Sequence, residues 1–555
     1  MVRKINYDEW SKEELIKELR RIKETKYGLV WHRDLPEEKI DILINPDART
    51  PNEMFPNEMS GKPFPVLREA KGKEIKTDKT KPVNLIIEGD NYHSLAVLNF
   101  THQEVIDLIY IDPPYNTGND DFIYNDKMKS DYVKSDDPFR HSKWISFMER
   151  RLKLAKNLLK PTGAIFISID DNEQAPLKMI CDEIFDESNF IGTVVRKRRG
   201  SQANLAKNIS PIHEYLLIYG KSPETLLNKL TPNINEGDFI NNDNDPRGSY
   251  VTMPCTNKGG SKYEIITPTG VKYSDEWRFK KETFSKLLKD KKIVFPKKGD
   301  GKPRYKLFLN EKMEKGIIAN TWWDDISTNQ EGTIELKEFF NDDVVFNNPK
   351  PVGLIKHILR LATKKNSIVL DFMAGSGTTG HAVMELNKED SGNRQFILCT
   401  NNENNICTEV CYPRIKKVVN GYKNSRKENV AGLGGNIKYY TCDFVEAEPT
   451  DRNKRKLVNE STEMLCIKED AFELIKDEKD FKIFKNSDKY LGIVFYEEAI
   501  DDFKKAIKKM DGHFNTYVFS LGDDSHEKQF VDVKGKVTLC AIPEVILKVY
   551  REIFK

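Results

Sequence analysis

Three continuous apolar segments constrain the fold of this chain more than any other feature of its sequence. They cover residues 84–90, 105–115 and 163–170, and each of them turns polar at its end. An amphipathic helical pattern over residues 141–163 separates the last two segments, and another helical pattern follows Asp170. Segments this apolar need to be buried on both faces, and the helices between them supply that cover. The pattern therefore predicts an α/β domain built on a parallel sheet.

The same α/β pattern breaks off near residue 195 and returns at residue 350. Between these points the sequence has one more apolar strand, at 213–221, and then short strand signals with many polar turns. The returning segments are a helix at 350–363, a strand, turn and helix at 367–380, and strands at 394–401 and 435–444. We therefore expect one α/β domain that is interrupted by an inserted, loop-rich domain.

These patterns divide the chain of 555 residues into five parts. We expect an N-terminal helix and arm at 1–82, the first half of the α/β core at 83–194, the insertion at 195–345, the second half of the core at 346–444, and a charged α+β domain at 445–555. Charged residues make up 32% of the chain, and no apolar run approaches the roughly 20 residues of a membrane-spanning helix. The N-terminus has no apolar signal segment, so we expect a cytoplasmic protein with no membrane partner.

A glycine-rich turn between the strand and the helix of 367–380 is the first candidate site. It reads Asp371-Phe372-Met373-Ala374-Gly375-Ser376-Gly377-Thr378-Thr379-Gly380. Glycines let the chain turn sharply and let a ligand approach the backbone, while free amides at a helix start favour an anion. Residues 375–380 also fit G-x-G-x-x-G, so a dinucleotide site with Glu403 as its ribose-binding acid is an alternative. A tight turn that only packs is the other alternative.

The second candidate site is Asp112-Pro113-Pro114-Tyr115, at the end of an apolar strand. Sheets of this class bind ligands beyond the carboxyl ends of their strands. The two prolines fix the backbone and remove two amide donors, which leaves the Asp112 carboxylate and the Pro113 carbonyl as acceptors beside an aromatic ring. Such a site suits an amino group on a flat ring. A proline-containing turn with a structural tyrosine is the alternative.

A basic stretch at 278–306 holds twelve basic and three acidic residues in a chain whose net charge is only +2. Aromatic residues are interleaved with it, so it suits a nucleic acid, whose phosphates bind Lys and Arg. A shorter basic run marks the entry into the insertion. The candidate DNA contacts are Arg196, Lys197, Arg198, Arg199, Lys291, Lys292, Lys297, Lys298 and Arg304. The alternative for both runs is a solvated surface over a small hydrophobic core.

The order of the two sites resembles a known family. Residues 112–126, 139–159 and 372–379 are similar to the modification subunit of type III restriction–modification systems, which are β-class adenine DNA methyltransferases. In that class the DPPY motif precedes the F-x-G-x-G motif, and here the DPPY segment likewise precedes the glycine turn, which reads FMAGSG at 372–377. The resemblance covers roughly residues 1–445 and continues through segments 27–33, 85–95, 168–185 and 348–359.

The resemblance implies a fold, a reaction and partners. The fold would be a circularly permuted Rossmann-like methyltransferase sheet with an inserted DNA target-recognition domain and a C-terminal α+β domain. The reaction would move a methyl group from S-adenosylmethionine to N6 of an adenine flipped out of double-stranded DNA. The partners would be a second copy of the chain and a restriction subunit with helicase and endonuclease activity, and residues 445–555 would make the dimer contacts or the partner contacts. The protein would lie in a prokaryotic cytoplasm, at the nucleoid.

The resemblance also assigns residues. Those that would hold the target adenine are Asp112, Pro113, Pro114 and Tyr115. Those that would lie at the cofactor are Asp90, Asn91, Asp371, Phe372, Ala374, Gly375, Gly377, Thr378 and Glu403, with Asn401 and Asn402 as alternatives for the ribose contact. The helix after Pro351 would cover the methionine end of the cofactor. No metal is expected, because the eight cysteines are scattered without a CxxC pair.

Three rival functions compete with this assignment. A nicotinamide-dependent oxidoreductase would use the glycine turn, but it leaves the DPPY segment and the basic stretch unexplained. A cytosine amino-methyltransferase shares the chemistry, but its motif usually starts with Ser, and Asp112 favours adenine. A DNA-specificity subunit without activity would have degenerate catalytic residues, whereas those of this chain are intact.

Overall fold

The computed structural model describes residues 11–13, 15–16, 63–118, 137, 139–202, 208–341, 343–446, 448–486, 489–520, 526–543, 546–547 and 550. Most of the N-terminal helix and arm that the sequence predicts at 1–82 lies outside these residues. The chain divides into a main unit, formed by residues 1–226 and 321–555, and an inserted unit, formed by residues 227–320. Among the described residues, no helix is long and apolar enough to cross a membrane.

Within the described part of the main unit, eleven strands form one mixed sheet in the order β1-β18-β3-β15-β14-β4-β5-β7-β6-β13, with β2 paired to β18. Their bounds are β1 Phe64–Glu69, β2 Ile75–Lys76, β3 Val83–Glu88, β4 Ile106–Ile111, β5 Leu159–Ile169, β6 Phe190–Lys197, β7 His213–Gly220, β13 Trp322–Trp323, β14 Ile368–Asp371, β15 Gln395–Thr400 and β18 Asn436–Val445. The strands from β18 to β5 are parallel, as predicted, and β7 is antiparallel to both of its neighbours.

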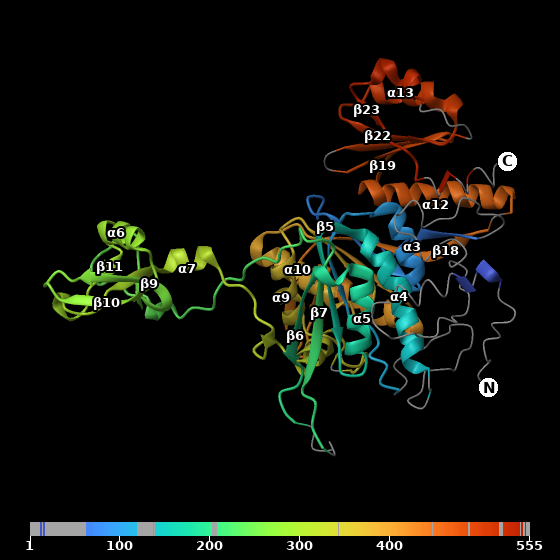
Figure 1. Ribbon diagram of the computed structural model, residues 1–555. Coiled ribbons are helices and arrows are strands. Elements are labelled where there is room, and N and C mark those ends of the chain that lie inside the picture. Colours follow the sequence, from blue (N-terminus) through green and yellow to red (C-terminus); the bar gives the residue numbers. More distant parts are fainter. Residues whose placement is uncertain are drawn as a thin grey trace. The chain divides into compact units, whose positions relative to one another are not determined.

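Helices cover both faces of this sheet (Figure 1). One layer consists of α3 (Asn91–Thr101), α4 (Arg140–Leu158) and α5 (Gln174–Phe185), which contact one another in chain order. The opposite layer consists of α9 (Val352–Ala362), α10 (Thr378–Asp390) and α11 (Tyr412–Asn420), with α10 in contact with both others. Helix α8 (Asn329–Phe339) precedes this second layer in the chain. The sheet is thus the buried middle layer of three, which explains its continuous apolar strands.

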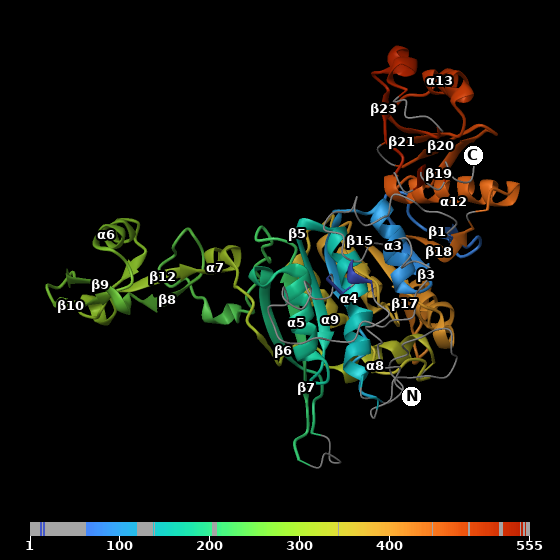
Figure 2. The same cartoon turned by 45° about the vertical axis from the view of Figure 1, so that its right-hand side comes forward.

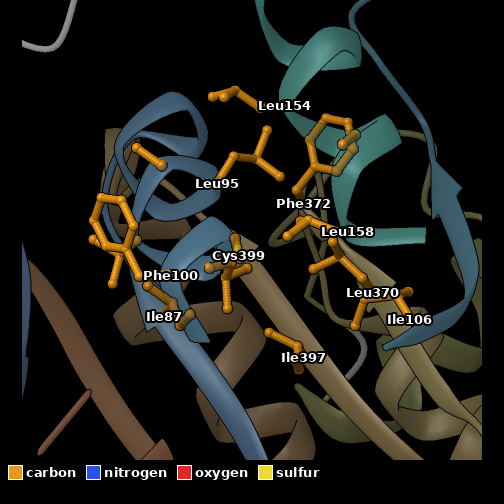
Figure 3. Close-up of a cluster of buried hydrophobic side chains, with 14 of the residues drawn as sticks. Ile87, Leu95, Phe100, Ile106, Leu154, Leu158, Leu370, Phe372, Ile397 and Cys399 are labelled. Atoms are coloured by element: carbon orange, nitrogen blue, oxygen red, sulfur yellow. The ribbon is translucent and has the colours of Figure 1, made fainter. Parts of the chain in front are cut away.

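Successive residues of a strand point to opposite faces of the sheet, so each strand contributes to the hydrophobic core on both faces. Ile109 and Ile111 on β4 belong to the hydrophobic cluster under α3, α4 and α5. Figure 3 shows Ile87 and Ile397 from the sheet in this cluster, together with Leu95 of α3 and Leu158 of α4. On the other face, a Cβ on Gly380 would lie 2.8 Å from Ile415 and 3.0 Å from Leu398, so α10 packs tightly against α11 and β15.

The inserted unit contains a two-stranded and a three-stranded antiparallel sheet in its described residues. Its elements are β8 (Tyr250–Pro254), β9 (Thr256–Ile266), β10 (Lys272–Trp277), α6 (Lys281–Lys289), β11 (Ile293–Val294), β12 (Arg304–Phe308) and α7 (Leu309–Lys315). Trp277 and Phe284 are buried in its core, against which Phe279, Phe295 and Tyr305 pack. The aromatic residues of the basic stretch therefore form a small core and are not an open stacking platform.

The boundaries of the insertion are narrower than the predicted 195–345. Strands β6 and β7 belong to the main sheet, and β13 pairs with β6, so the inserted unit begins at Leu227 and ends at Asn320. The sequence prediction failed here because β7 is antiparallel and its hairpin with β6 breaks the strand–helix alternation. The arm predicted at 1–82 is also too long, because β1 and β2 pair with β18 of the main sheet.

The C-terminal residues have the predicted α+β composition. Helix α12 (Asp451–Glu469) is followed by a five-stranded sheet of β19 (Glu473–Asp477), β20 (Phe481–Lys485), β21 (Tyr490–Val494), β22 (Phe514–Val518) and β23 (Val537–Leu539), with α13 (Ile500–Lys508) between β21 and β22. Helix α12 contacts α3, β1 and β18 (Figure 2). Leu457 and Leu465 share a hydrophobic cluster with the main core, so these residues form part of the main unit.

Candidate active site

The two predicted motifs lie at the ends of neighbouring strands. β14 pairs in parallel with β4, with Val369 opposite Leu108 and Leu370 opposite Ile109. Asp371 is the last residue of β14, and Asp112 directly follows β4. Because parallel neighbours end at the same edge of a sheet, these two segments meet although the inserted unit separates them in the sequence.

The DPPY segment is held rigidly by the two helices that follow it. Trp144 of α4 donates a hydrogen bond of 2.6 Å from its indole nitrogen to the Pro114 carbonyl. The next residue, Asn116, is fully buried and has a positive φ of 55°. Its side-chain amide donates to Glu173 at 2.5 Å and to the carbonyl of Arg140 at 3.2 Å. The backbone of the motif is therefore fixed before any substrate arrives.

The Asp112 carboxylate accepts an ion-paired hydrogen bond that the sequence did not predict. The Lys350 ammonium lies 2.6 Å and 2.7 Å from its two oxygens. Lys350 directly precedes Pro351 and α9, and its side chain is only 6% exposed. Burial raises the pKa of Asp112 above its ordinary value, while the Lys350 charge lowers it. Asp112 is thus a partly buried carboxylate whose charge depends on a neighbouring cation.

A second carboxylate, Glu214 of β7, stands behind this pair. One of its oxygens accepts a hydrogen bond from the Tyr115 hydroxyl at 3.3 Å and lies 3.9 Å from the Lys350 ammonium. Its other oxygen accepts from Arg196 of β6. Burial tends to raise the pKa of Glu214, but the charges of Lys350 and Arg196 outweigh it and lower the pKa. The hydroxyl of Tyr115 is therefore tied to an ionised carboxylate, and its ring orientation is fixed.

The glycine turn is pinned by the carboxylate that opens it. Asp371 accepts a hydrogen bond of 2.5 Å from the Thr379 hydroxyl and one of 3.0 Å from the Met373 amide. The Ala374 amide donates to the Cys399 carbonyl of the neighbouring strand β15 at 3.1 Å. Burial, opposed by these hydrogen bonds, raises the pKa of Asp371 to about 7. The loop is closed on the side of the sheet by its own hydrogen bonds.

The two glycines of the turn have different roles. Both have positive φ, 48° for Gly375 and 78° for Gly377, which is a region that favours glycine. A Cβ on Gly375 would lie 3.0 Å from the Phe346 ring. A Cβ on Gly377 would instead lie 3.1 Å from the Cys411 sulfur, in the protein interior. Gly377 therefore permits close packing against the π-helical turn Ile406–Cys411 that leads into α11, and the space beside it belongs to the protein.

Two further residues assigned to the cofactor face inward with their side chains. Phe372 is fully buried and lies among Leu95, Leu158 and Leu370 in the core (Figure 3), so only its backbone can meet a ligand. The Thr378 hydroxyl accepts from the buried Arg414 guanidinium at 2.8 Å. Both side chains therefore hold the loop in place by contacts with the protein interior.

The remaining cofactor candidates lie at the ends of β3 and β15. The Asp90 carboxylate caps α3 by accepting from the Tyr92 amide at 2.6 Å, and it also accepts from Arg151 at 3.3 Å. The Asn91 side chain accepts from the same guanidinium. Asn401 and Glu403 are exposed beyond β15, whereas the Asn402 side chain accepts from the Thr408 amide and is part of the loop. Of the three ribose candidates, Asn401 and Glu403 are thus the more accessible.

These residues fit S-adenosylmethionine, the cofactor that the resemblance implies. The turn from Asp371 to Gly377 lies at the end of the central strand β14, and Gly375 lacks a side chain there, with the Phe346 ring 3.0 Å from where its Cβ would be. Exposed oxygen acceptors at Glu403 and Asn401, beyond the adjacent strand, suit ribose hydroxyls. In the described part of the chain, no group of three or more His, Cys, Asp or Glu side chains is arranged to hold a metal ion.

The predicted DNA contacts fall into three groups. Arg196 is 1% exposed and paired with Glu214, so its prediction as a phosphate contact is wrong. Four members are half-buried, and three of these have protein partners. Arg198 lies 3.8 Å from Asp170, Lys292 lies 2.5 Å from Glu311, and Arg304 donates to Thr252. The fourth is Lys197. Arg199, Lys291, Lys297 and Lys298 are exposed; the last three are called the exposed lysine trio below.

Comparison with known proteins agrees with this geometry. A family model described as DNA methylase matches residues 106–410, which include both motifs and the whole inserted unit. The StyLTI Mod subunit of Salmonella typhimurium, a type III restriction-modification enzyme, is 40% identical over 57% of this chain. The alignment spans only about half of that relative, 52% of its length.

Two other relatives are covered more completely. The EcoPI Mod subunit of Escherichia phage P1, also a type III restriction-modification enzyme, is 31% identical over 70% of this chain and 71% of the relative. The type II methyltransferase M.KpnI of Klebsiella pneumoniae is 34% identical over 64% of this chain and 90% of the relative. Among solved structures, the cytosine-N4-specific PvuII DNA methyltransferase is 12% identical and matches over 61% of this chain and 93% of that one. Its TM-score of 0.34 is too low to add to the assignment. On the family model and these relatives, the chain belongs to the DNA methylase family.

Proposed function

We propose that this chain is a site-specific DNA methyltransferase that transfers a methyl group from S-adenosylmethionine to N6 of adenine, as the modification subunit of a type III-like restriction–modification system. The observation that carries the proposal is the meeting of the Asp112–Tyr115 segment and the Asp371–Gly377 turn at the ends of the adjacent strands β4 and β14. One segment offers acceptors and an aromatic ring, and the other offers a glycine turn that opens a helix.

The DPPY segment has the groups that an adenine amine requires. The N6 hydrogens would be accepted by the Asp112 carboxylate and the Pro113 carbonyl, and the purine ring would stack on Tyr115. Stacking of this kind contributes about 1–3 kcal/mol per base. Hydrogen bonds to acceptors draw the N6 lone pair out of the ring and make the nitrogen a better nucleophile. The positions of these groups are set by Trp144, Asn116 and Glu214, which hold the segment in place.

Held at the Asp371–Gly377 turn, S-adenosylmethionine would supply a methyl group on a cationic sulfur, and as the N6–C bond formed the C–S bond would break with its electron pair left on sulfur. The Asp112 carboxylate would take the proton that the methylated N6 loses and pass it to water. N6 cannot be reached inside a duplex, so the target base would leave the stack at a cost of a few kcal/mol. The Tyr115 ring, held by its hydroxyl at Glu214, gives the flipped base a fixed surface.

The inserted unit is the part of this chain that we propose to recognise DNA. Its exposed lysine trio, Lys291, Lys297 and Lys298, would contact phosphates, and Arg199 of the main unit would add a further contact. We further propose a cytoplasmic homodimer that acts on double-stranded DNA at the nucleoid and has a restriction subunit as partner. Light scattering at micromolar concentration would test the dimer, and a monomer mass would contradict it.

The test of the activity is a methylation assay with a nucleoside readout. The purified chain is incubated with unmethylated plasmid DNA and isotope-labelled S-adenosylmethionine, and the DNA is digested and analysed by mass spectrometry. We expect label in N6-methyladenine, none in N4-methylcytosine, and none with the Asp112→Ala variant, which should still bind the cofactor in calorimetry. Label in N4-methylcytosine would assign a cytosine amino-methyltransferase, and absence of label with the folded wild-type chain would refute the proposal.

A further inference from the structure

Four side chains of alternating charge form a buried line that ends at the Asp112 carboxylate. In order they are Arg196 on β6, Glu214 on β7, Lys350 before α9 and Asp112 after β4. Their side chains are 1%, 2%, 6% and 27% exposed, so Asp112 is the member most open to a substrate. The line therefore connects the interior of the main unit to one acceptor of the proposed adenine site.

Stability alone does not account for an ammonium group at this position. Taking charges out of water is costly, and a buried ion pair often contributes no more stability than well-packed apolar residues. The Lys350 ammonium is placed with both oxygens of Asp112 in reach, at 2.6 Å and 2.7 Å, and it lies 5.1 Å from the centre of the Tyr115 ring. Its contacts are with the two side chains that the proposed reaction uses.

The groups around Asp112 have opposing effects on its ionisation. The titratable groups that face it, besides Lys350, are Tyr110 on β4, Tyr115, Glu214 on β7 and Asp371 at the end of β14. Burial is the largest influence and raises the pKa of Asp112, Lys350 lowers it, and the negative charge of Glu214 raises it. The Tyr115 hydroxyl, which lies near Asp112 as well as Glu214, also lowers the pKa of Asp112 by hydrogen bonding. Without Lys350, the burial and the Glu214 charge would favour the protonated acid, and this hydrogen bond would oppose them.

A protonated Asp112 would be a poor partner for the adenine amine. A carboxylate has about four acceptor positions, whereas a carboxylic acid gives one of its oxygens a hydrogen to donate. The ammonium group occupies one direction at each oxygen of Asp112, which leaves the others for an N6 hydrogen. Lys350 can therefore stay in place while the base binds.

We propose that Lys350 is a positioning residue for methyl transfer: its ammonium group keeps Asp112 ionised and turned toward the target amine. The negative charge of Glu214 opposes this effect of Lys350 on Asp112. This inference rests on the proposed function, because it gives Asp112 its role there. Arg196 completes the arrangement by keeping Glu214 in place.

The first test compares the pH dependence of kcat for wild type, Lys350→Met and Lys350→Arg. With Lys350→Met, the acid limb of the profile should move up by about 1–3 pH units, so that activity lost at neutral pH returns in alkaline buffer. Lys350→Arg keeps the charge and should leave the limb near its wild-type position. Cofactor affinity measured by calorimetry should be the same in all three. A variant that only loosened the fold would lower the whole profile without moving its limb.

Glu214→Gln supplies a shift of the opposite sign. This variant keeps the shape of the side chain and a partner for Tyr115 and Arg196, but it removes the negative charge that raises the pKa of Asp112. The acid limb should therefore move to lower pH. Acid limbs that do not move in either variant, or that move in the same direction, would overturn the proposal. If Lys350→Met does not fold, the Glu214→Gln comparison decides alone.

A measurement without turnover separates this inference from the proposed function. The melting temperature of Lys350→Met is followed against pH beside that of the double variant Lys350→Met/Asp112→Asn. In the single variant the folded pKa of Asp112 should lie above its unfolded value, so the stability from Asp112 is complete below the unfolded pKa and is lost as pH rises through the folded one. The melting temperature of the single variant should therefore fall relative to that of the double variant as pH rises over that range. Wild type and Asp112→Asn supply the reference pair, because burial raises the pKa of Asp112 even with Lys350 present. A divergence no larger than that of the reference pair would overturn the proposal even if wild type methylates adenine, and a larger one would support it even if wild type methylates another base.

Discussion

Replacement of Arg196 by methionine distinguishes a structural cation from a contact with DNA. The guanidinium donates hydrogen bonds to the Glu214 carboxylate, to the Asn329 side chain at 2.9 Å and to the Ser327 carbonyl. Methionine has a similar length but offers none of these bonds. In Arg196→Met, Glu214 would remain buried with Lys350, at 3.9 Å, as its nearest cation.

The expected loss of stability follows from this environment. Breaking a buried ion pair by removing one partner costs about 3–5 kcal/mol, because the other charge is left without compensation. Lys350 offsets part of that cost here, so we expect about 3 kcal/mol, at the lower end of the range. Methylation should also fall, since the Tyr115 hydroxyl donates to the same Glu214 carboxylate. The effect on DNA affinity should be indirect and independent of salt.

Arg199→Met is the matched control, because Arg199 is three residues further along the chain and exposed. Urea unfolding of both variants and wild type, followed by circular dichroism, measures stability, and DNA titrations at several salt concentrations measure phosphate contacts. Arg199→Met should stay within about 0.5 kcal/mol of wild type. If Arg199 binds a phosphate, its loss should reduce the slope of log affinity against log salt by about 0.9.

One pair of results would refute this reasoning. If Arg196→Met unfolds at the same urea concentration as wild type and its salt slope falls by about 0.9, Arg196 contacts a phosphate and the buried ion pair does not stabilise the chain.

Further predictions concern the motifs and the inserted unit. Tyr115→Ala should lose most methylation, and Tyr115→Phe should lose less, because it keeps the ring and gives up only the hydrogen bonds of the hydroxyl with Glu214 and Asp112. Equal losses in a kcat assay would mean that the hydroxyl matters more than the ring. Gly377→Val should lower both the melting temperature and cofactor affinity, since its side chain would meet Cys411 and its φ is 78°; loss of affinity without loss of stability would place the cofactor there instead. Replacing the exposed lysine trio with Ser should reduce the salt slope of DNA binding by about 3 units and leave the methylated sequence unchanged, as methylation mapping would show. Burial raises the pKa of Asp371 to about 7, so the stability that its protonated form gives is lost as pH rises through that value. The melting temperature of Asp371→Asn should therefore fall less over this range than that of wild type. Melting temperatures that fall in parallel would contradict this.

The order and type of the core elements followed from local patterns in the sequence. Apolar segments that end in polar residues correspond to β3, β4, β5, β14 and β15, because a strand buried on both faces leaves little freedom in composition. The same reasoning put Asp112 and Asp371 at strand ends and hence at one edge of the sheet. The side chains that support each motif were not predicted in this way.

The boundaries of the insertion show where local patterns are insufficient. The sequence near 190–220 reads as the end of an α/β alternation, yet β6 and β7 extend the main sheet as a hairpin. An antiparallel extension needs no intervening helix, so the alternation that marks parallel strands stops before the sheet does. Only the pairing of β7 with β5 shows that the domain continues.

The sequence by itself determined the class of the sheet, the positions of the two motifs and the chemistry of the groups within them, because these depend on residues that are neighbours in the chain. Tertiary structure alone decided that Lys350 and Glu214 stand at Asp112, that Arg196 is buried with them, and that Gly377 faces Cys411. A charged residue reads the same in sequence whether it faces water or a buried partner. Its role is set by the free energy of burial, which depends on groups that folding brings together from distant parts of the chain.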